Sequence, residues 1–142
     1  MKKFPKQYTK GLSDKDKVKQ IKQLTKSSMD YEKGLFTGRK KLESFKGKKS
    51  QYVEKFTKKT GIPVNIDKIA DKFSKNPKRK KNLKEGMEQG IKKAKGAYYS
   101  AGSRPNQTPS SWSKARLASV LVGGPARKID KNIVDKYNLP KI

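Results

Sequence analysis

The sequence predicts a mostly α-helical protein, and three observations lead to that fold class. Apolar residues recur at spacings of three and four in several segments, which is the period of one helix face. No segment alternates apolar and polar residues as a half-buried strand does. Hydrophobic residues make up only 31% of the 142 residues, so the core must be thin and parts of the chain are expected to fold against a partner.

The longest expected helix lies between Leu83 and Tyr99. Its apolar residues follow the helical period and are Leu83, Met87, Ile91, Ala94 and Tyr98. Gly102 is expected to end it. Gly86, Gly90 and Gly96 lie inside the helix, and each costs about 1 kcal/mol relative to alanine. The helix is therefore marginal, or its glycines allow another part of the chain to approach closely.

Two shorter helices are expected to complete a compact helical module over residues 76–142. Thr108 is a plausible N-cap with Pro109 at the first helical position, and the glycine pair at 123–124 ends the helix that follows. Asp130 is a candidate cap for a last helix that reaches Tyr137.

The N-terminal half is expected to be extended, loop-rich and punctuated by short helices. Residues 1–12 are predicted to form an extended basic arm, because proline and glycine interrupt any pattern there. Residues 13–75 are predicted to wrap partners, with caps at the start of each helix. The expected helices run from Ser13, capped with help from Asp16, to about 27–29, from Ser50 to Gly61, and from Asn65 to Phe73. The segment 31–49 between them is predicted to cross irregularly, anchored by its aromatic residues.

The charge of the chain points to anionic partners. There are 38 lysine and arginine residues against 12 acidic residues, giving a formal net charge of +26. Such a charge draws a protein to nucleic acid, to an anionic membrane or to an acidic protein surface. Composition alone does not choose among these three.

Several classes of function are disfavoured by what the sequence lacks. Without cysteine or histidine there is no disulfide framework, thiolate metal site or histidine-activated nucleophile. No apolar run approaches a membrane span, and the N-terminus does not resemble a signal peptide. Tyr98 or Tyr99 could act as a nucleophile with Arg104 or Arg116 stabilising charge, but in so short a chain we expect no enzymatic activity and no cofactor or metal.

Seven basic residues are candidate contacts to a polyanion or protein partner. Four belong to the run PKRKK, whose composition is typical of a phosphate-binding patch, a nuclear import signal or a solvated helix lead-in. The other three lie in the last third, where arginine makes oriented contacts that lysine cannot. These three could share one anionic group or, as we favour, bind backbone carbonyls at helix ends. The seven are Lys78, Arg79, Lys80, Lys81, Arg104, Arg116 and Arg127.

The only tryptophan, Trp112, is a candidate core residue or interface anchor. A single tryptophan on an apolar helix face usually fills the core of a small domain. Base stacking and an interface hot spot are the alternatives. The serines beside Pro109 could hold an anion at a helix N-terminus or, more simply, cap that helix.

Two blocks of the sequence resemble a small lysine-rich family encoded by large DNA viruses of algae and protists. The later block carries GSRPNQTP, then Trp112, then ARLASV and GGPARK, and the earlier block is KGLFTGRKKLESFKGKKSQYVEKFTKKTGI. The order of these motifs is too specific to come from composition. No catalytic or binding residue follows from the resemblance.

The resemblance implies a structural protein of the virion, present in host cytoplasm or nucleus during assembly. We expect a minor capsid component that cements capsomers beneath the outer shell and touches the major capsid protein and other minor capsid proteins. The anionic inner membrane or nucleic acid are possible further partners, and no small-molecule substrate is expected. The alternative is a basic DNA-binding protein that packages the genome.

Overall fold

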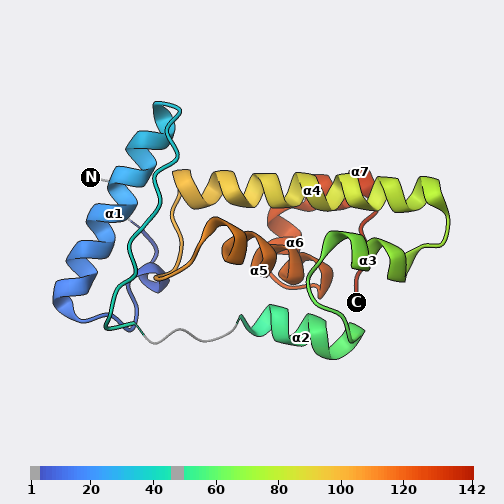
Figure 1. Cartoon of the computed structure of the whole chain (residues 1–142), viewed down its shortest axis with the longest axis horizontal. Coiled ribbons are helices and arrows are strands. Elements are labelled where there is room, and N and C mark those ends of the chain that lie inside the picture. The colour runs from blue at the N-terminus through green and yellow to red at the C-terminus, as the bar shows by residue number, and fades with distance from the viewer. Residues whose placement is uncertain (1–3, 46–49) are drawn as a thin grey trace. The chain divides into compact units, whose positions relative to one another are not determined.

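The computed structural model describes residues 4–45 and 50–142, and over these ranges the chain is mostly helical (Figure 1). A 3-10 helix at Lys6–Tyr8 is followed within the described ranges by seven α-helices and by no strand. The predicted fold class is therefore confirmed. The α-helices are α1 (Asp14–Glu32), α2 (Gln51–Thr60), α3 (Ile66–Phe73), α4 (Pro77–Ser100), α5 (Pro109–Leu121), α6 (Ala126–Ile129) and α7 (Lys131–Tyr137).

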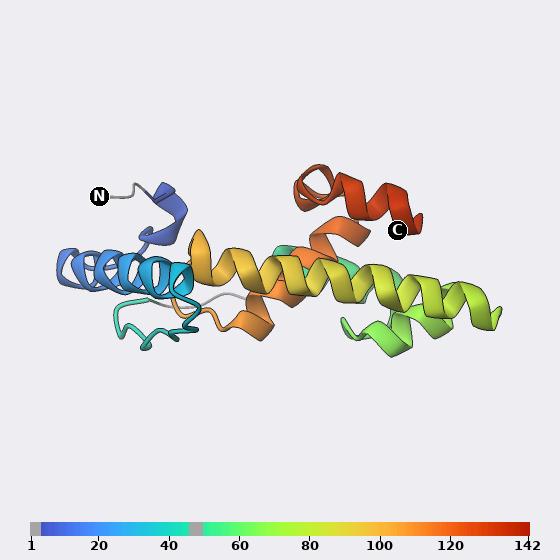
Figure 2. The same cartoon turned by 90° about the horizontal axis from the view of Figure 1, so that it is seen from above.

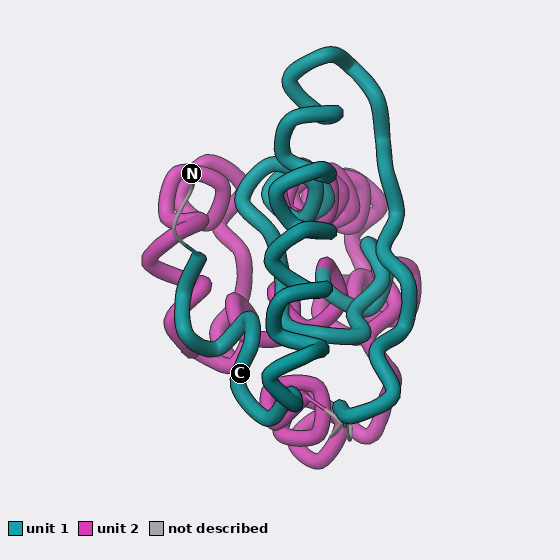
Figure 3. Tube along the Cα trace, turned by 90° about the vertical axis from the view of Figure 1, so that its left-hand side faces the viewer, with its two compact units in different colours: residues 1–48, 95–112 teal, residues 49–94, 113–142 magenta. Residues whose placement is uncertain are grey.

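The chain divides into two compact units, coloured separately in Figure 3. Unit 1 is made of residues 1–48 and 95–112, and unit 2 of residues 49–94 and 113–142. These boundaries differ from the expected ones at residues 12 and 75. The reason is that the N-terminal segment packs with the end of α4 and the loop after it, which lie far away along the chain.

The helix ends follow local sequence signals in most places. Ser13, Asn65 and Thr108 cap α1, α3 and α5 as predicted, because each side-chain oxygen accepts a hydrogen bond from the backbone N–H three residues later. Gly61 ends α2 with a φ of 73°, a backbone conformation that glycine adopts without strain. Ser50 precedes α2, but its side chain makes no capping hydrogen bond.

Two helices are longer than predicted. Helix α4 begins at Pro77, before the basic run rather than after it, since the Asn76 side chain accepts hydrogen bonds from the N–H groups of Lys78 and Arg79 at 2.9 and 3.3 Å. Proline suits this first position because its missing N–H would have no helical partner there. Helix α1 continues to Glu32, past the expected end at 27–29.

The hydrophobic core belongs to unit 2. Helix α5 contributes an unbroken buried run from Leu117 to Leu121, so all sides of this part of the helix are covered. Helices α3 and α7 lie on different sides of α4 (Figure 2). Other buried residues of this core are Phe56, Val64, Ile69, Ala70, Leu83, Met87, Val122, Ala126, Ile133, Val134 and Leu139.

Two of the three glycines within α4 lie where another residue approaches closely. A Cβ atom on Gly86 would lie 2.6 Å from the Cβ atom of Tyr137, and one on Gly96 would lie 3.2 Å from the Tyr31 hydroxyl. Around Gly90 nothing lies within 4 Å of the corresponding position. Close approach, one of the two explanations that the sequence left open, therefore accounts for Gly86 and Gly96.

Gly86→Ala is expected to destabilise the protein, whereas Gly90→Ala is expected to stabilise it. Overpacking costs about 1–3 kcal/mol. Alanine in place of glycine stabilises a helix by about 1 kcal/mol through its higher helix propensity. At position 86 the first effect dominates, because Tyr137 would meet the new methyl group with its own Cβ and Cγ atoms. Urea denaturation of both variants checks the opposite signs. A stabilised Gly86→Ala variant would show that α7 does not pack there.

Side chains in unit 1 tie an irregular segment to helix α1 and to the loop after α4. The Gln23 amide holds Lys40 at both its N–H (2.5 Å) and its carbonyl (3.3 Å). The Asn106 amide holds Leu42 in the same way, at 2.7 and 3.0 Å. In both cases a side-chain amide pairs with the backbone N–H and carbonyl of one residue, as a neighbouring β-strand would. Residues 33–45 of the predicted irregular crossing form no helix or strand, and polar side chains of its own chain anchor them as well as the aromatic residues. Residues 31–32 belong to α1, and residues 46–49 of the predicted crossing lie outside the described ranges.

Two carboxylates of α1 hold the ends of the same segment. Asp16 accepts hydrogen bonds from the Ser44 N–H (3.1 Å) and hydroxyl (2.5 Å), so it does not complete the predicted capping box with Ser13. Asp30 accepts from the Thr37 hydroxyl at 2.5 Å. The Ser44 donors lower the pKa of Asp16, and the Thr37 hydroxyl, followed by Lys26, lowers the pKa of Asp30.

The first residues are not an extended arm over the part that the structure describes. Residues 6–8 form the 3-10 helix, and Leu12 is buried. The Tyr8 ring meets the Trp112 ring edge-on, with 6.0 Å between their centroids. Aromatic packing holds this segment within unit 1. The first three residues of the expected arm lie outside the described ranges.

Candidate partner-binding surface

Two of the predicted contact arginines bind carbonyls of their own chain. Arg127 donates to the carbonyls of Val120, Leu139 and Pro140 at 3.0–3.1 Å. Arg79 donates to the last carbonyl of α7, that of Tyr137, at 2.8 Å, and to the next one at 2.5 Å. Helix ends leave such carbonyls without helical partners, and a cation there also opposes the negative end of the helix dipole. For Arg127 the favoured explanation, backbone carbonyls at helix ends, is what the structure shows. Arg79 had been predicted only as part of the basic run, and it too binds carbonyls at a helix end.

A third arginine belongs to a buried ion cluster in unit 2. Arg116 donates two hydrogen bonds to the carboxylate of Asp130, at 2.7 and 3.1 Å, and Lys93 approaches the same carboxylate to 3.1 Å. The Asp130 side chain is only 2% exposed. Its carboxylate therefore pairs with two cations. The capping hydrogen bond that was predicted from Asp130 to α7 is not formed.

The three arginines of the last third do not bind a common group. Arg116 is bound to Asp130 and Arg127 to carbonyls, whereas Arg104 is exposed and belongs to unit 1. Of these three, Arg104 keeps its guanidinium on the surface for an external anion.

The arginine with the most contacts in unit 1, Arg39, was not singled out from the sequence. Its guanidinium donates to the Tyr98 carbonyl, to the Ser103 hydroxyl (2.7 Å) and to the Ser27 hydroxyl (3.2 Å). It also lies 3.9 Å from the centre of the Tyr98 ring. Burial lowers the pKa of Arg39. Its only sequence signal was the rarity of arginine among lysines.

The enzymatic alternative gains no support from the tyrosines on which it depended. Tyr98 is 1% exposed, and its hydroxyl donates to the Gln107 carbonyl at 2.9 Å. Burial raises the pKa of Tyr98 above its ordinary value, which disfavours the phenolate that would attack a substrate. Tyr99 stacks on Tyr31, with 6.3 Å between the ring centroids.

Trp112 packs in unit 1 rather than in the core of the predicted C-terminal module. Its side chain is half-buried, and its contact is the edge-on packing with Tyr8. The indole N–H is buried and has no hydrogen-bond acceptor among the described residues. The large apolar core of unit 2 forms without Trp112.

The lysines of the run PKRKK lie in the first turns of α4. Lys78 and Lys81 are exposed, and Lys80 forms an ion pair of 3.2 Å with Asp71 of α3. No acidic residue lies in the first turn of this helix. Positive side chains at a helix N-terminus add to the positive end of the helix dipole. The start of α4 is therefore a positive patch.

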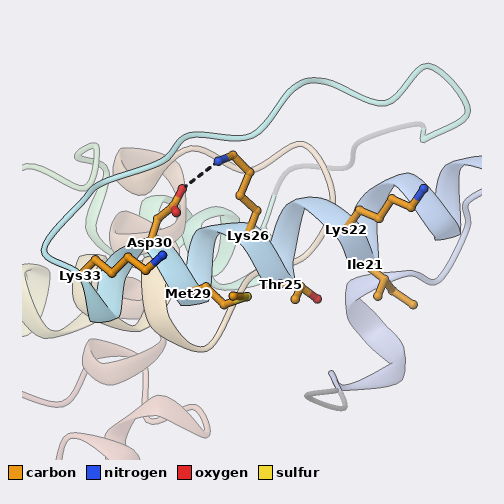
Figure 4. A pocket seen from close by; sticks show the side chains of 7 residues that line it. All are labelled: Ile21, Lys22, Thr25, Lys26, Met29, Asp30 and Lys33. Atoms are coloured by element: carbon orange, nitrogen blue, oxygen red, sulfur yellow. Dashed lines mark ion pairs between the residues drawn. The ribbon is translucent and has the colours of Figure 1, made fainter.

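Helix α1 presents an exposed apolar stripe. Val18 and Met29 are each 55% exposed and Ile21 is 36% exposed, although α1 buries its opposite face. Figure 4 shows Ile21, Thr25 and Met29 pointing the same way from the helix. A shallow groove runs along these residues. Single exposed apolar residues are common, but residues spaced by three and four along one helix form a continuous stripe.

A row of lysines borders one side of this stripe. At 3.6 residues per turn, five exposed lysines fall within an arc of about 60° next to the apolar residues. They are Lys15, Lys19, Lys22, Lys26 and Lys33. Lys26, which is exposed, makes an ion pair of 3.2 Å with the largely buried Asp30. We call the four stripe residues, Val18, Ile21, Thr25 and Met29, together with these lysines the α1 surface.

Within the described ranges, no helix has both the length and the apolar character that crossing a bilayer requires. The same ranges contain no group of three or more acidic side chains placed to hold a metal ion. The surface features that remain as candidates for partner binding are the α1 surface, Arg104 and the positive patch at the start of α4.

Comparison with known proteins gives one match. The model of a family of unknown function, DUF5824, matches residues 5–137. No curated protein and no solved structure matches the chain.

Proposed function

We propose that this chain, which belongs to the DUF5824 family of unknown function, is a structural protein of the virion of a large DNA virus. In this role it is a minor capsid component that binds capsid proteins beneath the outer shell and cements capsomers together. The virion context comes from the resemblance of its two sequence blocks to lysine-rich proteins of such viruses.

One observation carries the choice of a protein partner, namely the exposed apolar stripe on α1 beside a row of lysines. Duplex DNA offers phosphates to lysine but no continuous apolar face to a stripe of aliphatic side chains. An acidic protein surface offers both charge and apolar contact. The arrangement therefore favours the shell over the genome as the binding partner.

The internal use of arginine is consistent with a structural role. Arg39, Arg79, Arg116 and Arg127 hold the fold together, so the outer charge is carried mainly by lysine. Lysine is a flexible point charge that adapts to many anionic surfaces without fixed geometry. A cementing protein needs such broad adhesion, whereas a catalytic site needs fixed geometry.

Fractionation of purified virions tests this proposal. We expect the protein to remain with the shell when the DNA core is released, and to crosslink through its lysines to the major capsid protein. Recovery of the protein in the DNA core alone would contradict the shell role. A DNA-core protein recovered under the same conditions serves as the control for complete separation.

The alternative is a basic protein that packages the genome. The positive patch at the start of α4, with Lys78 and Lys81 exposed, favours it because phosphates would be attracted both by the lysines and by the helix dipole. If it holds, the purified protein binds duplex DNA with a log–log salt slope of about −0.9 per phosphate neutralised. Lys78→Glu with Lys81→Glu would then reduce that slope, while the same variant would still enter the shell under the cementing role.

A further inference from the structure

We propose that the α1 surface binds an acidic amphipathic helix of a partner protein. The inference rests on the proposed cementing role and specifies the kind of partner segment that one part of the surface recognises. The helix would place an apolar seam on Val18, Ile21 and Met29, and a row of carboxylates against the lysines.

The spacing of the stripe matches a helix better than a flat or irregular surface. Its four residues, Val18, Ile21, Thr25 and Met29, are separated by three, four and four positions, which is close to the repeat of a seam between two packed helices. The side chains are aliphatic or small, and three of the four, Ile21, Thr25 and Met29, line a shallow groove on α1. An apolar ridge on a second helix can lie in such a groove.

The position of the lysines determines the charge of the partner. In Figure 4, Lys22 and Lys26 leave α1 on a different side from Ile21, Thr25 and Met29. All five lysines of the row lie on one flank of the stripe. At 3.6 residues per turn, Lys17 lies on the other flank, and Asp14 and Glu32 fall in line with the two ends of the stripe. In paired helices the flanking positions set partner choice by charge. The complementary helix therefore carries glutamate or aspartate along one flank of its apolar seam.

Charge argues against a second copy of this chain as the occupant. In an antiparallel pair of α1 helices the lysine row of one helix would face the lysine row of the other. In addition, each copy has a formal net charge of +26. Repulsion between two such copies disfavours their association.

The narrowness of the stripe argues against a bilayer surface. Membrane-surface helices bury a broad face rich in leucine, phenylalanine and tryptophan. The α1 stripe has three aliphatic side chains with Thr25 among them and no aromatic residue. Its lysines are also unevenly placed, with five on one flank and Lys17 alone on the other, so they do not frame the apolar residues evenly as they would against lipid headgroups.

Binding of a designed probe to the purified full-length protein tests the proposal. The probe is a synthetic helix of about 20 residues, long enough to span the stripe at 1.5 Å per residue, with leucine along its seam and glutamate along one flank. A second probe has lysine in place of every glutamate. Fluorescence anisotropy is expected to show saturable binding of the acidic probe that weakens as salt rises, and no binding of the basic probe.

Two matched pairs of variants locate the binding site. Val18→Gln with Met29→Gln removes the apolar stripe without changing charge, and Leu35→Gln is its control because Leu35 is 56% exposed but lies outside α1. The stripe variant is expected to weaken binding at least tenfold and the control less than twofold. Equal binding by the stripe variant and the unaltered protein overturns the proposal.

The second pair tests the lysine row. Lys22→Glu with Lys33→Glu changes the charge by the same amount as Lys55→Glu with Lys58→Glu on α2, where both lysines are exposed. We expect at least a tenfold loss for the α1 pair and a smaller loss for the α2 pair. Equal losses would mean that only net charge matters, which contradicts a site on α1.

Vesicles of phosphatidylcholine and phosphatidylserine serve as the competing occupant. If they bind the protein, if the stripe variant abolishes that binding, and if the acidic probe does not bind, then α1 is a membrane site and the proposal fails. Helical circular dichroism equal to that of the unaltered protein confirms that each variant is folded.

Crosslinking of intact virions with a carbodiimide, which joins amines directly to carboxylates, distinguishes failure of the α1 site from failure of the cementing role. We expect Lys22 or Lys33 to be joined to acidic residues of a shell protein. If shell proteins are joined only to lysines outside α1, the cementing role remains supported and the α1 site is contradicted. If no lysine of the chain is joined to a shell protein, the cementing role itself is contradicted.

Discussion

Replacing Asp130 by alanine is expected to lower the free energy of unfolding by about 3–5 kcal/mol, the usual loss when one partner of a buried ion pair is removed. The Asp130 side chain is 2% exposed and the Arg116 side chain 13% exposed. Without the carboxylate, the Arg116 guanidinium would keep its burial and lose both of its hydrogen bonds to Asp130. Lys93, which is 40% exposed, can turn to water. Urea denaturation followed by circular dichroism measures the loss.

Asp67→Ala is the matched control for this experiment. Asp67 also pairs with a lysine in unit 2, Lys84 at 3.1 Å, but its side chain is 76% exposed. Exposed pairs contribute about 0–1 kcal/mol, so this variant is expected to unfold almost as the unaltered protein does. A similar small loss in both variants would mean that Asp130 is not a buried charge.

A double variant tests whether the cost at Asp130 comes from the unpaired arginine. Arg116→Met together with Asp130→Ala removes both charges and leaves an apolar side chain of similar length. Because two residues in direct contact couple, the double variant is expected to lose less than the sum of the two single variants. Additive losses would contradict coupling between the two side chains.

The ends of the helices could be predicted from the sequence because their signals are local. The side chains of caps such as Asn65 and Thr108 accept a hydrogen bond from the backbone N–H three residues later. Gly61 ends α2 because glycine adopts a positive φ without strain. Helix α4 begins earlier than predicted because Asn76 caps it, whereas apolar periodicity places its start only at Leu83. At each of these positions, a single residue is enough to set where the helix begins or ends.

The arrangement of unit 1 could not be predicted because its contacts join distant parts of the chain. The amide of Asn106 holds the backbone of Leu42, and the carbonyl of Ser103 accepts from Gln20, across 64 and 83 positions. An asparagine or glutamine has the same local signature whether it is solvated or bound to a distant backbone. For this reason an extended, loop-rich N-terminal half was predicted without the contacts that hold unit 1 together.

The candidate surface was predicted only in its general character. Net charge indicated an anionic partner, but it does not tell which of the cations face that partner. The arginines were predicted as contacts because of their geometry. In the structure Arg79, Arg116 and Arg127 bind their own chain. The stripe on α1 includes Val18 and Ile21, whose helical spacing marks one apolar face but which are exposed in the structure. Periodicity identifies an apolar face, but it does not tell whether the protein's own core or a partner covers it.

Removing the guanidinium of Arg39 is expected to have the largest effect within unit 1. Arg39→Ala leaves the Tyr98 carbonyl and the hydroxyls of Ser27 and Ser103 without their charged donor. Ser27 and Ser103 are fully buried, so water does not readily take its place. Hydrogen bonds to a charged group contribute about 1.5–3 kcal/mol each, and several are lost together. We expect the free energy of unfolding to fall by about 3 kcal/mol, since the contributions are not additive.

Arg39→Lys and Arg104→Ala show whether this effect comes from geometry rather than charge. Lysine keeps the positive charge at position 39 but cannot fork between three acceptors or lie flat on the Tyr98 ring, so it is expected to recover less than half of the loss. Arg104, in the same unit, is exposed, and its removal is expected to change stability by less than about 0.5 kcal/mol. The fluorescence of Trp112, the only tryptophan and part of unit 1, follows unfolding in urea. Full recovery by lysine would show that Arg39 acts as a charge alone, and the forked contact would then not be what holds the segment after α1 in place.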